Sequence, residues 1–210
     1  DAALNKIAES GVKYLLICGD LTKDGEMVNH ELLAQKLDEF EKSSGIQVFV
    51  TNGNHDISND RAVRFDADTT SKVESATTEQ FREIYGKFGY DEAVAKDSNS
   101  LSYAVNLGDD YRLIVMDSCI YNDESDFEKR RQETGGEFSD SEWNWILEQI
   151  EDAVRDGRRP IGMMHHGLVP HTEIQPSMFS EYLLNDYERV AAALADAGMN
   201  LVFTGHFHSQ

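Results

Sequence analysis

The sequence predicts an α/β fold, with one domain in which apolar strands alternate with amphipathic helices. Four short apolar runs have the composition of buried strands, namely residues 12–18, 46–50, 160–164 and 200–203. Segments with helical periodicity separate them. Residues 101–106 and 111–116 flank Gly108-Asp109-Asp110 and predict an antiparallel hairpin, so the sheet is expected to be mixed. A chain of 210 residues is long enough for a single domain with a substantial core.

The composition disfavours long nucleic acid as a partner and gives no indication of a membrane span. Acidic residues outnumber basic residues by 39 to 19, and a formal net charge of −20 disfavours long nucleic acid, whose phosphates bind basic surfaces. No run of about 18 apolar residues is present, so no membrane span is expected. Cys18 and Cys119 lie at or near the ends of apolar runs and predict free buried thiols. None of this indicates a compartment or a protein partner.

The first strand leads into a predicted helix over residues 26–42 and then into the second strand. This order predicts a parallel pair of strands. The apolar residues expected on the inner face of the helix are Val28, Leu32, Leu33, Leu37 and Phe40. His30 lies among charged residues, and we expect it on the surface. Later in the chain, Ser139-Asp140-Ser141-Glu142 predicts a capping box, and Asn185 with Glu188 predicts the cap of a helix over residues 185–198.

Two segments, at about residues 57–100 and 121–138, are predicted to be inserted loops. The first carries a Ser/Thr-rich stretch and one short helix around Phe81. Loops of this length in a compact domain are usually functional. Arg61 and Arg64 could bind a phosphate through bidentate hydrogen bonds, and solvated surface arginines are an equally good interpretation.

Polar motifs follow four of the predicted strands directly. They are Gly19-Asp20, Gly53-Asn54-His55-Asp56, His165-His166-Gly167 and Gly205-His206-Phe207-His208. Five of the seven histidines lie in these motifs, and open α/β sheets bind ligands just past the carboxyl ends of their strands. Taken alone, the second motif is explained as well by an Asn-Gly turn and a helix cap. Its recurrence at four strands favours a functional site.

The residue types in these motifs predict metal binding. Imidazole, carboxylate and amide ligands without thiolate suit Zn, Mn, Fe or similar ions rather than Ca. A carboxylate such as Asp20 can bridge two ions about 3.5–4 Å apart. If the backbone there is extended, His206 and His208 point to the same side and suit one ion each. His55 can exchange a proton near neutral pH.

The four motifs, in this order, resemble those of the calcineurin-like metallophosphoesterases. The resemblance implies a four-layer αββα sandwich with mixed sheets and two divalent transition-metal ions that share a bridging hydroxide. It implies that Asp20 bridges the ions and that His208 binds one of them. The ligands implied for the other ion are Asn54, His165 and His206. His165 is preferred to His166 because it leaves the strand first, and His166 then becomes a candidate for contact with substrate.

The resemblance also assigns the proton transfer. It implies that His55 contacts the phosphate and protonates the leaving oxygen, and that Asp56 orients His55. The expected function is metal-dependent hydrolysis of a small phosphate ester. A diester is favoured because long loops can shape a specific pocket. An inactive phosphoesterase-like binding module is disfavoured because His55 and Asp56 are intact, and an amide hydrolase would not need the Asn-His-Asp triplet.

The sequence departs from the family pattern at both ends. The family begins with a strand ending in Asp-x-His, which supplies two ligands to the ion that His208 also binds, and it continues with strands beyond Gly-His-x-His. We therefore expect residues 1–210 to be an incomplete domain, truncated at both ends, with one metal site incomplete. Activity is expected to be impaired and to be rescued when the first strand is restored.

Overall fold

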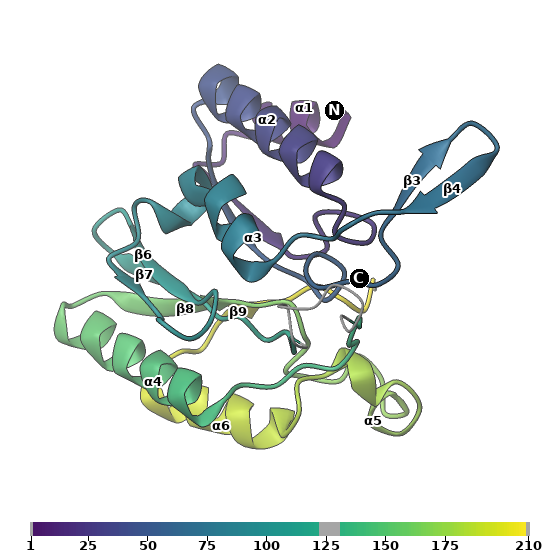
Figure 1. Ribbon diagram of the computed structural model, residues 1–210. Coiled ribbons are helices and arrows are strands. Elements are labelled where there is room, and N and C mark those ends of the chain that lie inside the picture. Colours follow the sequence, from purple (N-terminus) through teal and green to yellow (C-terminus); the bar gives the residue numbers. More distant parts are fainter. Residues whose placement is uncertain (1, 122–130, 209–210) are drawn as a thin grey trace.

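The computed structural model describes residues 2–121 and 131–208, and its strands form three sheets within those ranges (Figure 1). A parallel pair contains β1 (Tyr14–Cys18) and β2 (Gln47–Thr51), as predicted. A hairpin of β3 (Val63–Asp66) and β4 (Thr69–Lys72) projects from the body of the molecule. The third sheet contains β5 (Ala95–Lys96), β6 (Tyr103–Leu107), β7 (Tyr111–Val115), β8 (Arg159–Met163) and β9 (Val202–Phe203).

Helices lie on the outer sides of the parallel pair and of the five-stranded sheet, so the architecture is the expected four-layer αββα sandwich (Figure 1). On the side of the parallel pair lie α1 (Ala2–Ala8) and α2 (Met27–Ser44). On the far side of the five-stranded sheet lie α4 (Asp140–Arg155) and α6 (Tyr187–Ala197). The five-stranded sheet is mixed, because β5, β6 and β7 pair antiparallel while β7, β8 and β9 pair parallel. None of the described helices has the length and apolar character needed to cross a membrane.

The alternation of residues along β7 divides the interior into two cores. Leu113 and Val115 join the core between the two sheets, whereas Ile114 and Met116 join the core beneath α4 and α6. Successive side chains of a strand point to opposite faces, and both faces are covered at Leu113, Ile114 and Val115, which explains why this part of β7 is continuously apolar. The central strands are therefore rigidly held, and their carboxyl ends provide a stable base for the loops that follow.

The buried face of helix α2 differs from the inner face predicted for it. Val28 is 66% exposed, and His30, expected on the surface, is fully buried. The buried stripe runs through His30, Leu37 and Phe40, which repeat at helical spacing. His30 can be buried because both ring nitrogens have partners: Nδ1 lies 2.9 Å from the Tyr85 hydroxyl and Nε2 lies 2.9 Å from the backbone oxygen of Asp56.

The segment 57–100 is more ordered than a loop. It contains the hairpin β3–β4, helix α3 (Thr78–Ile84) and a π-helical turn (Gly86–Tyr90) before β5. The hairpin residues are largely exposed, so no apolar alternation marks them in the sequence. Of the second expected loop, residues 122–130 lie outside the described part of the chain.

Two predicted helix caps form only in part. Ser139 Oγ accepts from the Glu142 backbone N–H at 3.2 Å, but the Glu142 carboxylate accepts a 2.6 Å hydrogen bond from Ser102 Oγ instead of closing a capping box. Helix α6 begins after Asp186, which makes no side-chain cap. Asn185 donates to Glu137 at 3.2 Å. Tertiary partners in the neighbouring elements compete for these side chains.

Candidate metal centre

Strands β1, β2, β8 and β9 deliver their polar motifs to one edge of the sandwich. Glycines allow the ends of the two sheets to approach closely. A Cβ added to Gly19 would lie 2.5 Å from His165 Nδ1, and one added to Gly205 would lie 2.7 Å from the Cys18 oxygen. Side chains larger than hydrogen are therefore excluded at both positions. The glycines in the predicted motifs are needed for this close approach.

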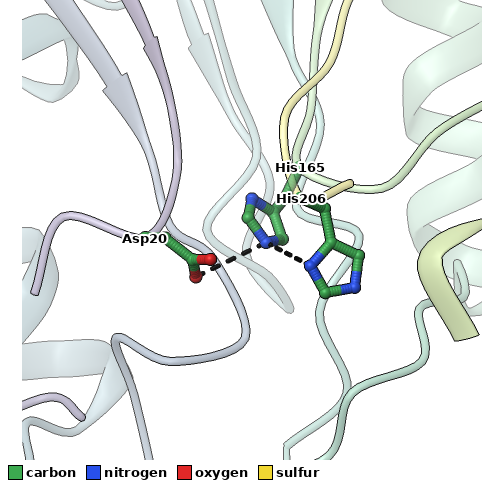
Figure 2. Close-up of side chains that lie close together, drawn as sticks. All are labelled: Asp20, His165 and His206. Carbon is green, nitrogen blue, oxygen red and sulfur yellow. Dashed lines mark hydrogen bonds and ion pairs between the residues drawn. The ribbon is translucent and has the colours of Figure 1, made fainter. Parts of the chain in front are cut away.

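Four predicted ligands converge at this edge, and Figure 2 shows three of them, Asp20, His165 and His206. His165 Nε2 lies 3.0 Å from His206 Nδ1, 3.1 Å from Asn54 Oδ1 and 3.4 Å from Asp20 Oδ1. The carboxylate and two imidazoles each offer one ligand atom, and these atoms all lie within 4.8 Å of one another. Ligands placed about 2.1 Å from a common ion lie at most about 4.2 Å apart, so the 3.0–3.4 Å distances from His165 Nε2 suit such an ion.

The tautomers of the two histidines decide what these atoms can bind. His165 Nδ1 lies 2.7 Å from the Cys18 backbone oxygen, which only accepts, so the ring hydrogen is on Nδ1. His206 Nε2 lies 3.1 Å and 3.3 Å from the backbone oxygens of Thr134 and Glu181, so its hydrogen is on Nε2. The nitrogens that face each other therefore carry lone pairs, and they face the oxygens of Asp20 and Asn54. Lone pairs that face one another repel, and a cation bound between them would attract all four atoms.

Burial keeps these imidazoles neutral. It lowers the pKa of His165 to about 3, with a further contribution from the neighbouring His206. Burial also lowers the pKa of His206, although the carboxylate of Asp20 acts in the opposite direction. A metal ligand must offer a free lone pair, so side chains that stay unprotonated at neutral pH fit a divalent ion.

The backbone of Gly205-His206-Phe207-His208 is not extended. An extended backbone was the condition under which His206 and His208 were expected to point to the same side. His206 has φ 70° and His208 has φ 53°, both in the left-handed region, and so does Asp20 with φ 53°. Non-glycine residues in this region cost about 1–3 kcal/mol each and are concentrated at functional sites. His206 is buried and His208 is exposed, yet both line the same cavity.

The cavity at this edge has a volume of about 250 Å³. Its lining contains Asp20, Asn54, His55, Arg61, Gln132, Thr134, Tyr182, His206, Phe207 and His208. Arg61 lines this cavity, and its contact with a phosphate stays a prediction. Arg64 does not line it, because this side chain lies on the exposed hairpin and forms a 2.8 Å ion pair with Asp66.

Asp24, rather than Asp56, lies beside the imidazole of His55. His55 Nδ1 is 2.8 Å from the Lys23 backbone oxygen and 3.3 Å from Asp24 Oδ1. Asp56 instead accepts from the backbone N–H groups of Gly53 at 2.8 Å, of Thr22 at 2.8 Å and of Leu21 at 3.0 Å. Its carboxylate therefore ties the loop after β1 to the loop after β2.

The environment of Asp56 is consistent with this structural role. Burial raises the pKa of Asp56, and hydrogen bonds from the backbone N–H groups lower it. Burial has the larger effect, and the pKa rises to about 6. The side chain is fully buried and is not among the cavity residues. The predicted orienting contact from Asp56 to His55 is thus replaced by one from Asp24.

His166 is also removed from the cavity. It is fully buried, with Nδ1 2.7 Å from Ser118 Oγ and Nε2 2.9 Å from the Thr134 backbone oxygen. With both nitrogens engaged and no exposure, it has no free atom for a substrate. The pKa of His166 is lowered to about 3, mainly by burial and further by the neighbouring His165 and His206.

Several residues at the site carried no usable signal in the sequence. Asp24 lies four positions beyond Asp20, in a charged loop of ordinary composition. Gln132, Thr134 and Tyr182 come from loops that have no motif, and they reach the cavity only through packing. Their side chains could not have been assigned from periodicity or spacing.

The converging lone pairs define a candidate metal centre, and the family whose model this chain matches supports metal-dependent hydrolysis of phosphate esters. The chain belongs to the calcineurin-like phosphoesterase family, whose model matches residues 1–210. Among solved structures, it is similar to a dimetal phosphatase from Danio rerio, with a TM-score of 0.60 and 12% sequence identity over 99% of this chain and 70% of that one. At this identity the likeness concerns the fold. A comparison with curated proteins gave no match.

Proposed function

We propose that this protein hydrolyses small phosphodiesters, with two divalent ions as cofactors. The observation that carries the proposal is the set of four converging lone-pair atoms from Asp20, Asn54, His165 and His206. Three of these residues, all except His165, line a cavity that also contains His55. Divalent ions, when bound, lower the pKa of water and neutralise charge on phosphoryl oxygens.

The residues of the chain have distinct roles in this proposal. Asp20, Asn54, His165 and His206 would hold one ion, and Asp20 and His208 would contribute to the site of the second. His55 donates a proton to the leaving oxygen from Nε2, because Nδ1 is engaged by the Lys23 oxygen and the Asp24 carboxylate.

A diester is favoured over a monoester on electrostatic grounds. A diester carries one negative charge and a monoester close to two, while the chain has a formal net charge of −20. The acidic surface therefore repels a diester less. Arg61 supplies a cation in the cavity lining for a non-bridging oxygen.

The test is a comparison of leaving groups in the presence of Mn. Diesters with a p-nitrophenol or a phenol leaving group are hydrolysed by wild type and by His55→Ala. If His55 donates the proton, the variant loses about 10²-fold or more with the phenol leaving group and distinctly less with p-nitrophenol, which needs no proton. Arg64→Ala, on the exposed hairpin, is the control. Equal losses for both leaving groups would contradict the role of His55, and faster turnover of monoesters would contradict the diester assignment.

A further inference from the structure

A cluster of aromatic rings lies beside the candidate metal centre. Tyr182 and Phe207 both line the cavity, and their ring centroids are 5.4 Å apart at an angle of 74°. Phe179 lies 6.3 Å from Phe207, and the ring of His171 stacks on Phe207 at 5.2 Å with an interplanar angle of 12°. The cluster reaches the metal ligands, because the Tyr182 ring is 4.6 Å from that of His206.

The backbone holds these rings in place. Tyr182 follows α5 (Gln175–Met178) in a 3₁₀ turn (Ser180–Tyr182), and its backbone oxygen accepts a 3.0 Å hydrogen bond from the N–H of Gly167. Phe207 is carried between two predicted metal ligands. The rings are thus positioned by the same segments that position the imidazoles, which is the preorganisation expected of a binding surface.

The rings are not part of a hydrophobic core. Phe179 is 41% exposed, while Tyr182 and Phe207 are half-buried, and none of the three belongs to either of the two core clusters. Aromatic side chains packed only for stability are normally covered. Here exposed ring surface adjoins a polar cavity that contains Arg61 and the candidate ligands.

We propose that Phe179, Tyr182 and Phe207 form a subsite for a flat aromatic ring carried by the ester group of the substrate that does not leave. This inference rests on the proposed phosphodiesterase activity and specifies its substrate class: a phosphodiester with an aromatic group such as a nucleobase. The rings offer stacking and edge contacts, which select for aromatic character rather than for hydrophobic size alone.

The experiment keeps the leaving group constant and changes the retained group. Three p-nitrophenyl phosphodiesters are compared, in which the retained group is phenyl, cyclohexyl or thymidine-5′. Phenyl and cyclohexyl have similar size, so their kcat/KM ratio reports aromatic recognition. Intrinsic differences in reactivity cancel when the ratio for each variant is divided by that for wild type. The variants are Phe179→Leu and Phe207→Leu, which remove a ring but retain apolar volume.

The proposal expects the phenyl-to-cyclohexyl ratio to fall about threefold or more in both ring variants. The thymidine ester should lose kcat/KM relative to the cyclohexyl ester in the same variants. Met178→Ala is the control, because this 65% exposed side chain is on the same segment and carries no ring, so the ratio should stay as in wild type. Unchanged ratios in both ring variants would overturn the aromatic subsite alone. No hydrolysis of any ester by wild type would overturn the proposed function, and this inference with it.

Discussion

Replacing His165 should abolish stabilisation by metal, whereas replacing its neighbour His166 should not. The two imidazoles are adjacent in sequence and are both fully buried, with 1% and 0% exposure. They differ in where their nitrogens point. His165 turns Nε2 toward the oxygens of Asp20 and Asn54, whereas His166 uses both nitrogens on Ser118 and Thr134. His165→Ala and His166→Ala are therefore a matched pair.

The expected magnitudes follow from binding linkage. At a Mn concentration of 100 times Kd, an ion that binds only the folded chain stabilises it by about 2.7 kcal/mol. For a chain of this size that corresponds to an increase in Tm of about 5–10 °C. Each alanine also leaves buried hydrogen-bonding groups unpaired, which costs about 1–3 kcal/mol without metal. The two variants should therefore start from similar, lowered Tm values and differ in their response to Mn.

The assay is thermal unfolding followed by circular dichroism, with and without Mn, after treatment with EDTA. Wild type and His166→Ala should show the metal-dependent increase in Tm, and His165→Ala should lose most of it. An increase that survives in His165→Ala, or that disappears in His166→Ala alone, would refute the assignment of lone pairs on which the site is built. No increase in wild type would refute metal binding at this site.

Three further predictions concern the support of the site. Gly53→Ala should abolish the Mn-dependent increase in Tm, because its Cβ would lie 2.9 Å from His165 Cε1 and collide with Asp20, whereas Gly135→Ala, which meets nothing within 4 Å, should retain it. Asp24→Asn should lower kcat more for diesters with a phenol leaving group than for those with p-nitrophenol, because it weakens a contact that positions His55, and equal losses for both leaving groups would contradict this. Burial lowers the pKa of His30, so the folded chain binds fewer protons than the unfolded chain. Stability is therefore fully present above about pH 6.5 and falls as the pH decreases, by up to about 1.4 kcal/mol per pH unit for each such histidine, and urea unfolding at pH 5 and pH 7 should show a smaller loss in His30→Gln.

The carboxylate that contacts His55 could not be predicted from the sequence. The Asn-His-Asp triplet brings Asp56 next to His55 in the chain, and this adjacency suggested that the two side chains interact. In the folded protein Asp56 points into the interior and binds backbone N–H groups, while Asp24 approaches His55 from a loop 31 residues earlier. Adjacent residues in a turn diverge, so contacts at a turn depend on the segments packed against it.

His30 illustrates the same limit on a helix. Its charged neighbours in sequence predicted an exposed position, but the inner stripe of α2 passes through it. Burial of an imidazole is tolerated where two partners satisfy its nitrogens, and these partners are Tyr85 and the backbone of Asp56, both distant in sequence. Composition within a short window contains no information about such partners.

The sequence by itself determined the class of fold, the order of its central strands and main helices and the four strand ends that carry the metal-binding residue types. These follow from local periodicity, because alternation and helical spacing depend only on neighbouring residues. Tertiary structure alone decided which nitrogen of each histidine faces the site, which carboxylate supports His55 and which rings surround the cavity. Those features depend on how two sheets and their loops pack together, and the backbone carbonyls that fix the tautomers of His165 and His206 come from distant segments of the chain.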